Sequence, residues 1–312
     1  MQLGKLWLKT LRLFHVISEE KYRRGKIKYL PHIDKPAMQK IIDDFQGCGV
    51  AVNSERSPKL IVTLTSFPER MYDIHFTIYS LLNQSLKPDA VILWLAPSQF
   101  PNGENDIPEA VLKLKDNGLT IKWCEDLRSY KKLIPALKEF PKDILVTADD
   151  DIFYPINWLE LLYAGYLRDP KSVQCHRGHR LQFDKDGNIL PYKKWKHRIN
   201  HDIASFHNFF TGAGGVLYPP HTLYRDIADV KLFQKLAPNA DDIWFWAMAV
   251  LAGTPINIVE SRIKNLIYVN PERELKLTSE ITLAMVNTAD RQNDKQLQQI
   301  AEHYPQLMTY LR

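Results

Sequence analysis

The sequence is poor in cysteine and lacks the spacing that metal knuckles and disulfide frameworks need. Its three cysteines, Cys48, Cys124 and Cys175, lie far apart, are odd in number and form no Cys-x-x-Cys pair. This spacing argues against both a zinc knuckle and a disulfide framework. The simplest compartment for such cysteine usage is a reducing cytoplasm.

Long apolar runs, internal repeats and low-complexity segments are missing as well. No stretch is long enough to cross a bilayer, and we expect no secretory signal because a continuous apolar region with a small-residue cleavage site is absent. No zinc-finger spacing, recognition helix or RNA-binding aromatic signature occurs, so we expect no nucleic-acid partner. The formal net charge of +5 fits ligands that carry phosphate or an anionic lipid surface.

What is present is the composition of a folded globular protein: 312 residues, 45% hydrophobic and 25% charged. From residue 59 onward, short β-branched runs alternate with apolar residues at helical spacing. The predicted strands are 60–65, 90–95, 119–123 and 143–147, and the predicted helices are 74–82, 110–115 and 132–140. This alternation predicts an α/β fold with a doubly wound, mostly parallel sheet. Residues 177–201 are rich in charge and in turn formers, which predicts an irregular insert with a hairpin.

Three adjacent carboxylates, Asp149, Asp150 and Asp151, directly follow the fourth predicted strand. Ligands of open α/β sheets bind beyond the carboxyl ends of the strands, so this position suits a site. Neighbouring carboxylates repel one another, and a cation or a proton must compensate their charge. Mn²⁺ or Mg²⁺ would fit, with Asp149 and Asp151 as ligands and phosphate oxygens completing the shell. The alternative is that the acids cap a helix or cover a turn.

Three motifs follow one another in an order known from one group of enzymes. They are Thr-Leu-Thr-Ser-Phe-Pro-Glu-Arg at 63–70, Ser-Leu-Leu-Asn-Gln-Ser at 80–85 with Pro-Asp at 88–89, and Ala-Asp-Asp-Asp at 148–151. This order resembles bacterial glycosyltransferases of the GT-A fold, close to the family-2-like group, and the likeness covers about residues 59–253. The three aspartates look like the DxD motif, whose carboxylates hold the metal on the donor diphosphate.

The resemblance implies a nucleotide-sugar donor, a UDP-sugar by default, beside the loop after the first strand. Phe67 can stack on a base and Arg70 can reach phosphate. Asp126 suits ribose hydroxyls, and Lys132, which precedes Leu-Ile-Pro-Ala-Leu, suits ribose or phosphate. An ordinary turn and a charged helix start are the alternatives. The full donor set is Thr65, Ser66, Phe67, Arg70, Asp126, Lys132, Asp149 and Asp150.

Three glycines, Gly212, Gly214 and Gly215, lie in a loop before a predicted strand. The loop lacks the Lys and Ser/Thr of a Walker P-loop, which excludes that phosphate-binding motif. Glycine lets backbone approach a ligand closely, and the resemblance implies a wall of the sugar and acceptor pocket. A turn that needs glycine only for backbone geometry is the alternative.

Two acids, Asp241 and Asp242, begin an apolar helix predicted to run through Leu251. The pair resembles the acidic motif of inverting members, in which one carboxylate accepts the proton of the acceptor hydroxyl as general base. We prefer Asp242 and hold Asp241 in reserve, while first-turn acids also compensate a helix dipole. Trp244 is expected either to stack on a sugar face in the acceptor pocket or to belong to the core.

Residues 1–24 combine apolar side chains at helical spacing with basic ones, which predicts a basic amphipathic helix. Its apolar face fits either an anionic membrane surface or the protein's own body. We therefore expect a cytoplasmic protein, and peripheral contact with the inner face of the membrane and packing on the protein's own body stand as equal alternatives for this helix. The apolar residues concerned are Leu3, Trp7, Leu11, Phe14 and Ile17.

Together these features predict an enzyme, a metal-dependent hexosyltransferase acting on a glycan or glycolipid acceptor in lipopolysaccharide or capsule polysaccharide synthesis, with inversion at the transferred carbon. A retaining mechanism, a metal-dependent phosphohydrolase or nucleotidyltransferase, and a noncatalytic carbohydrate-binding protein are the alternatives. We expect an N-terminal helical extension (1–58), a GT-A catalytic domain (59–270) with donor half 59–155 and acceptor half 156–270, and a C-terminal helical segment (271–312).

Overall fold

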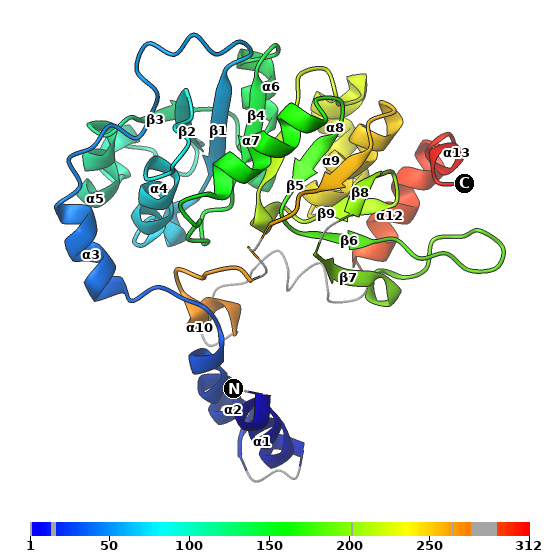
Figure 1. Cartoon of the computed structure of the whole chain (residues 1–312), viewed down its shortest axis with the longest axis horizontal. Helices are drawn as coiled ribbons and strands as arrows, with labels where there is room; N and C mark the ends of the chain where they lie inside the picture. Colours follow the sequence, from blue (N-terminus) through cyan, green and yellow to red (C-terminus); the bar gives the residue numbers. More distant parts are fainter. Residues whose placement is uncertain (1, 14–16, 201, 262, 264, 276–291) are drawn as a thin grey trace.

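The computed structural model describes residues 2–13, 17–200, 202–261, 263, 265–275 and 292–312. Its centre is an eight-stranded sheet in the order β3-β2-β1-β4-β10-β5-β11-β8 (Figure 1). Strands β10 and β8 run antiparallel to their neighbours, and the remaining strands are parallel. The strands are β1 (Leu60–Thr65), β2 (Ala90–Leu95), β3 (Leu119–Trp123), β4 (Ile144–Thr147), β5 (Val173–Cys175), β8 (Asp202–Ser205), β10 (Val216–Tyr218) and β11 (Ile256–Ile258).

Helices cover both faces of this sheet, because side chains alternate between the faces along each strand. On β1, Leu60, Val62 and Leu64 enter one apolar cluster and Ile61 enters the other. The helical elements on the first face are α4 (Ile74–Leu82), α5 (Glu109–Leu112), η4 (Lys113–Lys115) and α7 (Trp158–Arg168). Those on the second are η5 (Arg128–Lys132), α6 (Ile134–Glu139), α8 (Val230–Leu236) and α9 (Asp241–Leu251). The predicted α/β class with a mostly parallel sheet is confirmed.

The strand order places the first and the fourth strand side by side. The chain moves outward from β1 through β2 to β3 and then returns to the other side of β1, where Thr63 pairs with Thr147 of β4. The point where the strand order reverses is where open α/β sheets bind ligands. The loop that follows β1, with η2 (Pro68–Arg70), therefore meets the aspartates that follow β4.

A third segment reaches the same edge from the opposite direction. Because β10 is antiparallel to β4 and Val216 pairs with Thr147, the start of β10 lies at the carboxyl end of β4. The glycine loop, as the 3-10 turn η7 (Gly212–Gly214), leads into that start. Helix α9 on the second face begins nearby, since Gly212 contacts Asp242 in its first turn.

The remaining chain extends the second face. The predicted insert holds the antiparallel pair β6 (Gly178–Arg180) and β7 (Lys196–Ile199), with η6 (Tyr192–Lys194) between them, and β9 (Asn208–Phe210) completes a small sheet. Ile300 of α12 (Gln292–His303) and Leu307 of α13 (Leu307–Tyr310) join the apolar cluster around α9. The other short helices are η3 (Gly103–Asp106), η8 (Arg225–Ala228) and α10 (Pro271–Glu274).

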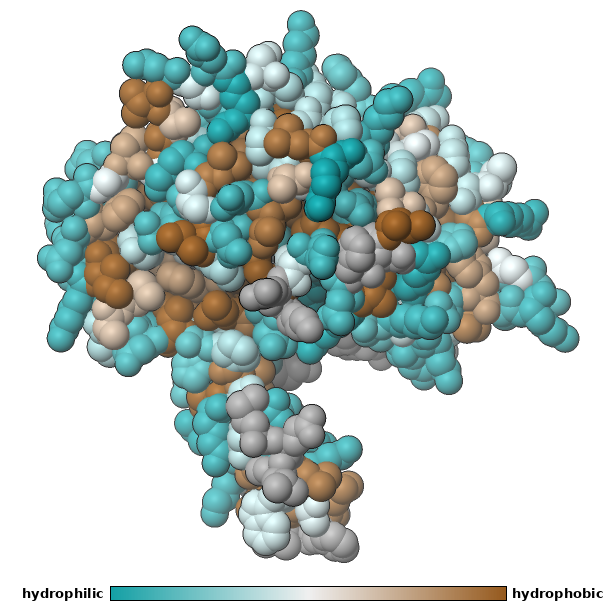
Figure 2. Space-filling model, in the orientation of Figure 1, coloured by the Kyte–Doolittle hydropathy of each residue, from teal (hydrophilic) through white to brown (hydrophobic). Residues whose placement is uncertain are grey.

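The N-terminal region is helical but does not form the one continuous amphipathic helix predicted. It contains α1 (Gln2–Leu13), α2 (Glu19–Lys26), η1 (Ile27–Tyr29) and α3 (Lys35–Asp43). Ser18 has an extended backbone and caps α2 by accepting a hydrogen bond from the Lys21 amide, so α2 starts as a separate helix. Figures 1 and 2 show α1 and α2 as an arm that projects from the body. None of the helices in the described part of the chain could span a bilayer.

Candidate active site

The loop after β1 and the aspartates after β4 are joined by hydrogen bonds around Asp150. Ser66 Oγ donates to Asp150 Oδ2 over 2.6 Å, and Arg70 donates from one guanidinium nitrogen to Asp150 Oδ1 over 2.5 Å and to Asp151 Oδ2 over 2.8 Å. The Thr77 hydroxyl donates to the Asp150 carbonyl oxygen over 3.1 Å. Asp150 is thus fully engaged in joining the two loops.

The three aspartates differ in exposure. The side chains of Asp149 and Asp151 are 27% and 25% exposed, whereas that of Asp150 is 9% exposed. The first and third carboxylates are therefore partly exposed to solvent, while the middle one is buried. Burial and the neighbouring Asp150 and Asp149 raise the pKa of Asp151 to about 6, although Arg70 opposes the shift.

Two cationic side chains of the chain itself offset part of the negative charge of this cluster. Arg70 pairs with Asp150 and Asp151, and Lys132 pairs with Asp149 at 2.5 Å. The sequence argument required a cation or a proton beside the three acids, and Arg70 and Lys132 are two such cations. A metal at this place has to be justified by its ligands and not by charge balance.

Lys132 connects the aspartates after β4 with the start of α9. Its Nζ lies 2.5 Å from Asp149 Oδ1 and 3.1 Å from Asp241 Oδ2, the second contact being an ion pair without hydrogen-bond geometry. Its carbonyl oxygen accepts the Thr63 hydroxyl, which fixes η5 against β1. Burial opposes its charge, but Asp149, Asp241 and Asp242 outweigh burial and raise the pKa of Lys132 well above the ordinary value.

Asp242 lies beside this network, next to the first glycine of the loop. The Gly212 amide donates to Asp242 Oδ2 over 2.9 Å. A Cβ atom at position 212 would stand 2.7 Å from Asp242 Oδ1 and 3.3 Å from Lys132 Nζ, so only glycine leaves both groups where they are. Burial and the neighbouring Asp241 raise the pKa of Asp242 to about 7, which suits a carboxylate that must take up a proton near neutrality.

Glycine is required at the other two positions of the loop for different structural reasons. A Cβ atom at Gly214 would lie 2.6 Å from the Cβ atom of Arg177. Gly215 has a φ of +89°, and its Cβ atom would lie 2.4 Å from the Trp158 ring. Gly215 is therefore required by backbone conformation and packing, which is the alternative that the sequence had left open for this loop.

Other predicted donor residues lie around the same edge of the sheet in different settings. The Thr65 hydroxyl is used within the sheet, because it donates to the Trp94 carbonyl oxygen over 2.8 Å. The partly exposed Phe67 ring lies 5.3 Å from the Arg70 guanidinium. Phe67 therefore has a surface to offer, whereas Thr65 has little.

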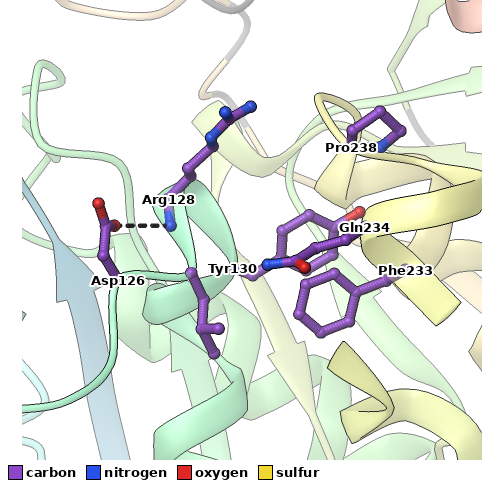
Figure 3. A pocket seen from close by; sticks show the side chains of 7 residues that line it. Asp126, Arg128, Tyr130, Phe233, Gln234 and Pro238 are labelled. Carbon is purple, nitrogen blue, oxygen red and sulfur yellow. Dashed lines mark hydrogen bonds between the residues drawn. The ribbon is translucent and has the colours of Figure 1, made fainter. Parts of the chain in front are cut away.

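Asp126 lines a hollow that does not include the three aspartates. This cavity of about 300 Å³ lies between η5 and α8 and includes Asp126, Arg128, Tyr130 and Phe233 (Figure 3). The Asp126 carboxylate accepts hydrogen bonds from the Arg128 amide and from Lys131 Nζ, each over 3.0 Å. None of the five clustered aspartates belongs to its lining.

The structure corrects the prediction that Trp244 lines the sugar pocket. Its ring is fully buried, and its indole nitrogen donates to the Ile227 carbonyl oxygen over 3.0 Å. It packs near Phe233 and Tyr304 in the core of the second face. Conversely, Tyr154 was missed: its hydroxyl accepts the Asp149 amide and donates to the Ala213 carbonyl oxygen, which ties the aspartates to the glycine loop.

The residues present offer two carboxylate oxygens to a metal ion. In the part of the chain that the structure describes, no group of three or more His, Cys, Asp or Glu side chains forms a metal cage. However, Asp149 Oδ2 and Asp151 Oδ1 receive no hydrogen bond from described residues, since Lys132 and Arg70 contact the opposite oxygens. Mg²⁺ and Mn²⁺ bound with a diphosphate commonly take only one or two protein carboxylates, so this donor set fits.

Comparison with known proteins adds little to the assignment. No protein-family model and no curated protein matches the sequence. One similar structure is TarS residues 1–349 of S. aureus, with TM-score 0.46, 14% identity and coverage of 80% of this chain and 73% of that one. Another is 2-C-methyl-D-erythritol 4-phosphate cytidylyltransferase of Francisella tularensis, with TM-score 0.43, 14% identity and coverage of 70% and 95%. Likenesses this distant do not bear on what the chain does.

Proposed function

We propose that the chain is a metal-dependent glycosyltransferase that moves a sugar from a nucleotide-sugar, by default a UDP-sugar, to a glycan or glycolipid hydroxyl in bacterial surface polysaccharide synthesis. One observation carries the proposal. Lys132 joins Asp149, a candidate donor-side ligand, to Asp241, the neighbour of the candidate base Asp242. Glycosyl transfer needs one group beside the leaving diphosphate and a base beside the attacking hydroxyl, close to each other. Asp149 and Asp242 are candidates for these two roles, and Lys132 and Asp241 link them.

On the donor side, Asp149 and Asp151 are the carboxylates that would hold Mn²⁺ or Mg²⁺. Such an ion, when bound with the donor, neutralises charge that develops on the leaving diphosphate. Arg70 and Lys132 contact the other oxygens of the same two carboxylates and provide further positive charge. Phe67, beside Arg70, is placed to stack on the nucleotide base.

On the acceptor side, Asp242 is the general base. The Gly212 amide holds Oδ2, which leaves Oδ1 to take the proton of the acceptor hydroxyl. The raised pKa of Asp242 matches this task, because a carboxylate with an ordinary pKa is a weak base at neutral pH. Attack by that hydroxyl on the face opposite the diphosphate inverts the configuration of the transferred carbon.

The deciding experiment measures nucleotide release from a panel of UDP-sugars with and without an acceptor, and with Mn²⁺, Mg²⁺ or chelator. The proposal expects metal-dependent release that rises several-fold when the acceptor is added, together with a sugar-containing product. Equal release without an acceptor would instead indicate a phosphohydrolase. Donor binding without any turnover across panels of acceptors would indicate a carbohydrate-binding protein.

The projecting arm of α1 and α2 supports peripheral membrane contact as part of this function. Leu6, Trp7 and Leu13 are 62%, 63% and 66% exposed, so these apolar side chains do not pack on the body. Lys5 and Lys9 on the same helix are also exposed. Apolar and basic side chains mixed on one arm fit the interface of an anionic bilayer, where a glycolipid acceptor would be found (Figure 2).

A further inference from the structure

Arg177 is built into the region between the two sheets, close to the glycine loop. It lies in the short link from β5 to β6, and its carbonyl oxygen accepts the Thr211 amide over 3.0 Å. Its guanidinium donates to the Thr211 hydroxyl over 2.6 Å. The absence of a side chain at Gly214 gives Arg177 its room, because a Cβ atom there would stand 2.6 Å from the Cβ atom of Arg177.

A second arginine shares a cleft with Arg177. Arg198 of β7 and Arg177 both line a small hollow of about 20 Å³, together with His176 and Asn200. Arg198 has a φ of +54°, an uncommon conformation for a non-glycine residue, and its amide donates to His179 Nδ1 over 3.1 Å. The backbone of β7 is therefore held in a conformation that keeps this residue beside the cleft.

The guanidinium groups of the two arginines make no close ion pair with the described residues. Among the residues that the structure describes, neither makes an ion pair of 4 Å or less with a carboxylate. Burial, followed by the nearby Arg198, lowers the pKa of Arg177. Burial raises the pKa of Glu274, whereas a hydrogen bond from Tyr268 and the charges of the two arginines lower it. Glu274 and Asp242 thus act on the arginines through their fields and not through an ion pair at contact distance.

This cleft is adjacent to the candidate base. Thr211, which binds the Arg177 guanidinium, is followed by Gly212, whose amide binds Asp242. The field of Asp242 also reaches Arg177. A group held by the arginines would lie on the acceptor side of the site, whereas Arg70 and Lys132 serve the aspartates on the donor side.

We propose that Arg177 and Arg198 form a subsite for a phosphate group of the acceptor substrate, next to the hydroxyl that receives the sugar. The assignment of this phosphate to the acceptor rests on the proposed function. The anion site itself follows from the two arginines. Guanidinium groups bind phosphate oxygens through paired, charge-assisted hydrogen bonds, and two arginines around one cleft match a tetrahedral anion. The acceptor is thereby narrowed to phosphorylated glycans and phosphate-linked lipids or polymers.

The first test is calorimetric titration of the full chain with glycerol 3-phosphate and with glycerol, at constant ionic strength and without nucleotide or metal. Glycerol 3-phosphate should bind and glycerol should not. The Arg177→Gln and Arg198→Gln double variant should bind the phosphate at least about tenfold more weakly. The matched control is Lys194→Gln with Lys196→Gln, which removes two exposed positive charges from the same insert and should change affinity less than about twofold.

The second test decides which substrate the arginines serve. Glycerol 3-phosphate should still bind when the enzyme is saturated with UDP and Mn²⁺, and UDP affinity should be the same in the double variant. Displacement by UDP, or joint loss of UDP binding, would overturn the acceptor assignment in favour of the donor diphosphate. Unchanged phosphate binding in the double variant would overturn the site altogether.

The phosphate-binding test can be read independently of protein stability and of glycosyltransferase activity. Arg198 is exposed, so Arg198→Gln alone can be measured if the double variant is unstable, and it should still weaken phosphate binding about threefold or more. The readout needs neither turnover nor donor. A chain that binds phosphate but releases no nucleotide would refute the glycosyltransferase proposal and leave the anion site standing.

Discussion

The amide of Gly212 lies 2.9 Å from Asp242 Oδ2, and the place of a Cβ atom at residue 212 is 2.7 Å from the other oxygen of the same carboxylate. Any side chain at 212 must push Asp242 aside. Because that oxygen is the far end of a flexible side chain, the fold should survive. We therefore expect Gly212→Ala to lower kcat about 10- to 100-fold while UDP affinity stays nearly constant.

The matched control for this substitution is Gly47→Ala. Gly47 is exposed, and its Cβ atom would contact only the Phe45 ring, at 3.3 Å. Steady-state rates and melting temperatures of both variants check the prediction. Full activity of Gly212→Ala would show that the position of Asp242 does not limit the reaction.

The pKa of Asp242 predicts how activity depends on pH. A base that titrates at about 7 is protonated and inactive in acid, so kcat/KM should rise with pH and level off above neutrality. Asp242→Asn should remove this limb and lower the rate by about 10² to 10⁴. A pH profile of the wild-type enzyme that stays flat from weakly acid to weakly alkaline solution would exclude Asp242 as the base.

The same shift affects stability in the opposite direction to that of a salt-bridged acid. The folded pKa of Asp242 lies above its unfolded value, so its favourable contribution is complete below about pH 4 and is lost as the pH rises through about 7. Asp242→Asn should thus gain stability relative to wild type on going from acid to weakly alkaline buffer. Denaturant unfolding of both proteins, in acid near pH 4 and in buffer above pH 7, measures the difference in their free energies of unfolding.

Asp151 and its neighbour Asp150 should respond differently to substitution. Asp151→Asn should abolish the part of UDP binding that depends on Mn²⁺ and leave the melting temperature close to wild type, because its side chain is partly exposed. Asp150→Asn is the control: it breaks the buried contacts to Ser66 and Arg70 and should cost about 2 kcal/mol of stability. Mn²⁺-dependent UDP binding that survives in Asp151→Asn would refute the metal assignment.

The N-terminal arm predicts binding to anionic vesicles. Replacing the exposed Leu6 and Trp7 by serine should weaken co-sedimentation with phosphatidylglycerol vesicles by at least about tenfold. The control is Ile156→Ser with Ile203→Ser, which removes two apolar side chains of the body that are 60% and 76% exposed and should leave binding unchanged. Equal binding of wild type to neutral phosphatidylcholine vesicles would contradict the role of the basic residues.

The sheet could be predicted because its strands are encoded locally. Runs of β-branched residues gave β1, β2 and β3 their bounds to the residue, and the alternation with helices gave the class. The proximity of the loop after β1 to the aspartates after β4 was implied only by the family resemblance, because the strand order that brings the two together is not encoded locally. The bounds of the strands need no long-range side-chain contact.

Contacts between distant residues could not be predicted in this way. Lys132 and Asp241 are far apart in sequence, and nothing local signals that one lysine serves two separate carboxylates. For the same reason the ion pairs of Arg70 with Asp150 and Asp151 could not be predicted. Trp244 was ambiguous because an aromatic residue on an apolar helix looks the same whether it faces a ligand or the core.

The short strand β10 has a consequence for dissecting the protein. It comes from the predicted acceptor half, yet its backbone is hydrogen-bonded to β4 of the donor half on one side and to β5 on the other. A fragment that ends at residue 155 would leave β4 as an exposed edge strand with unpaired backbone groups, which favours self-association. Attempts to exchange acceptor specificity by swapping half-proteins should therefore carry β10 along with β4, and graft only the insert around β6 and β7.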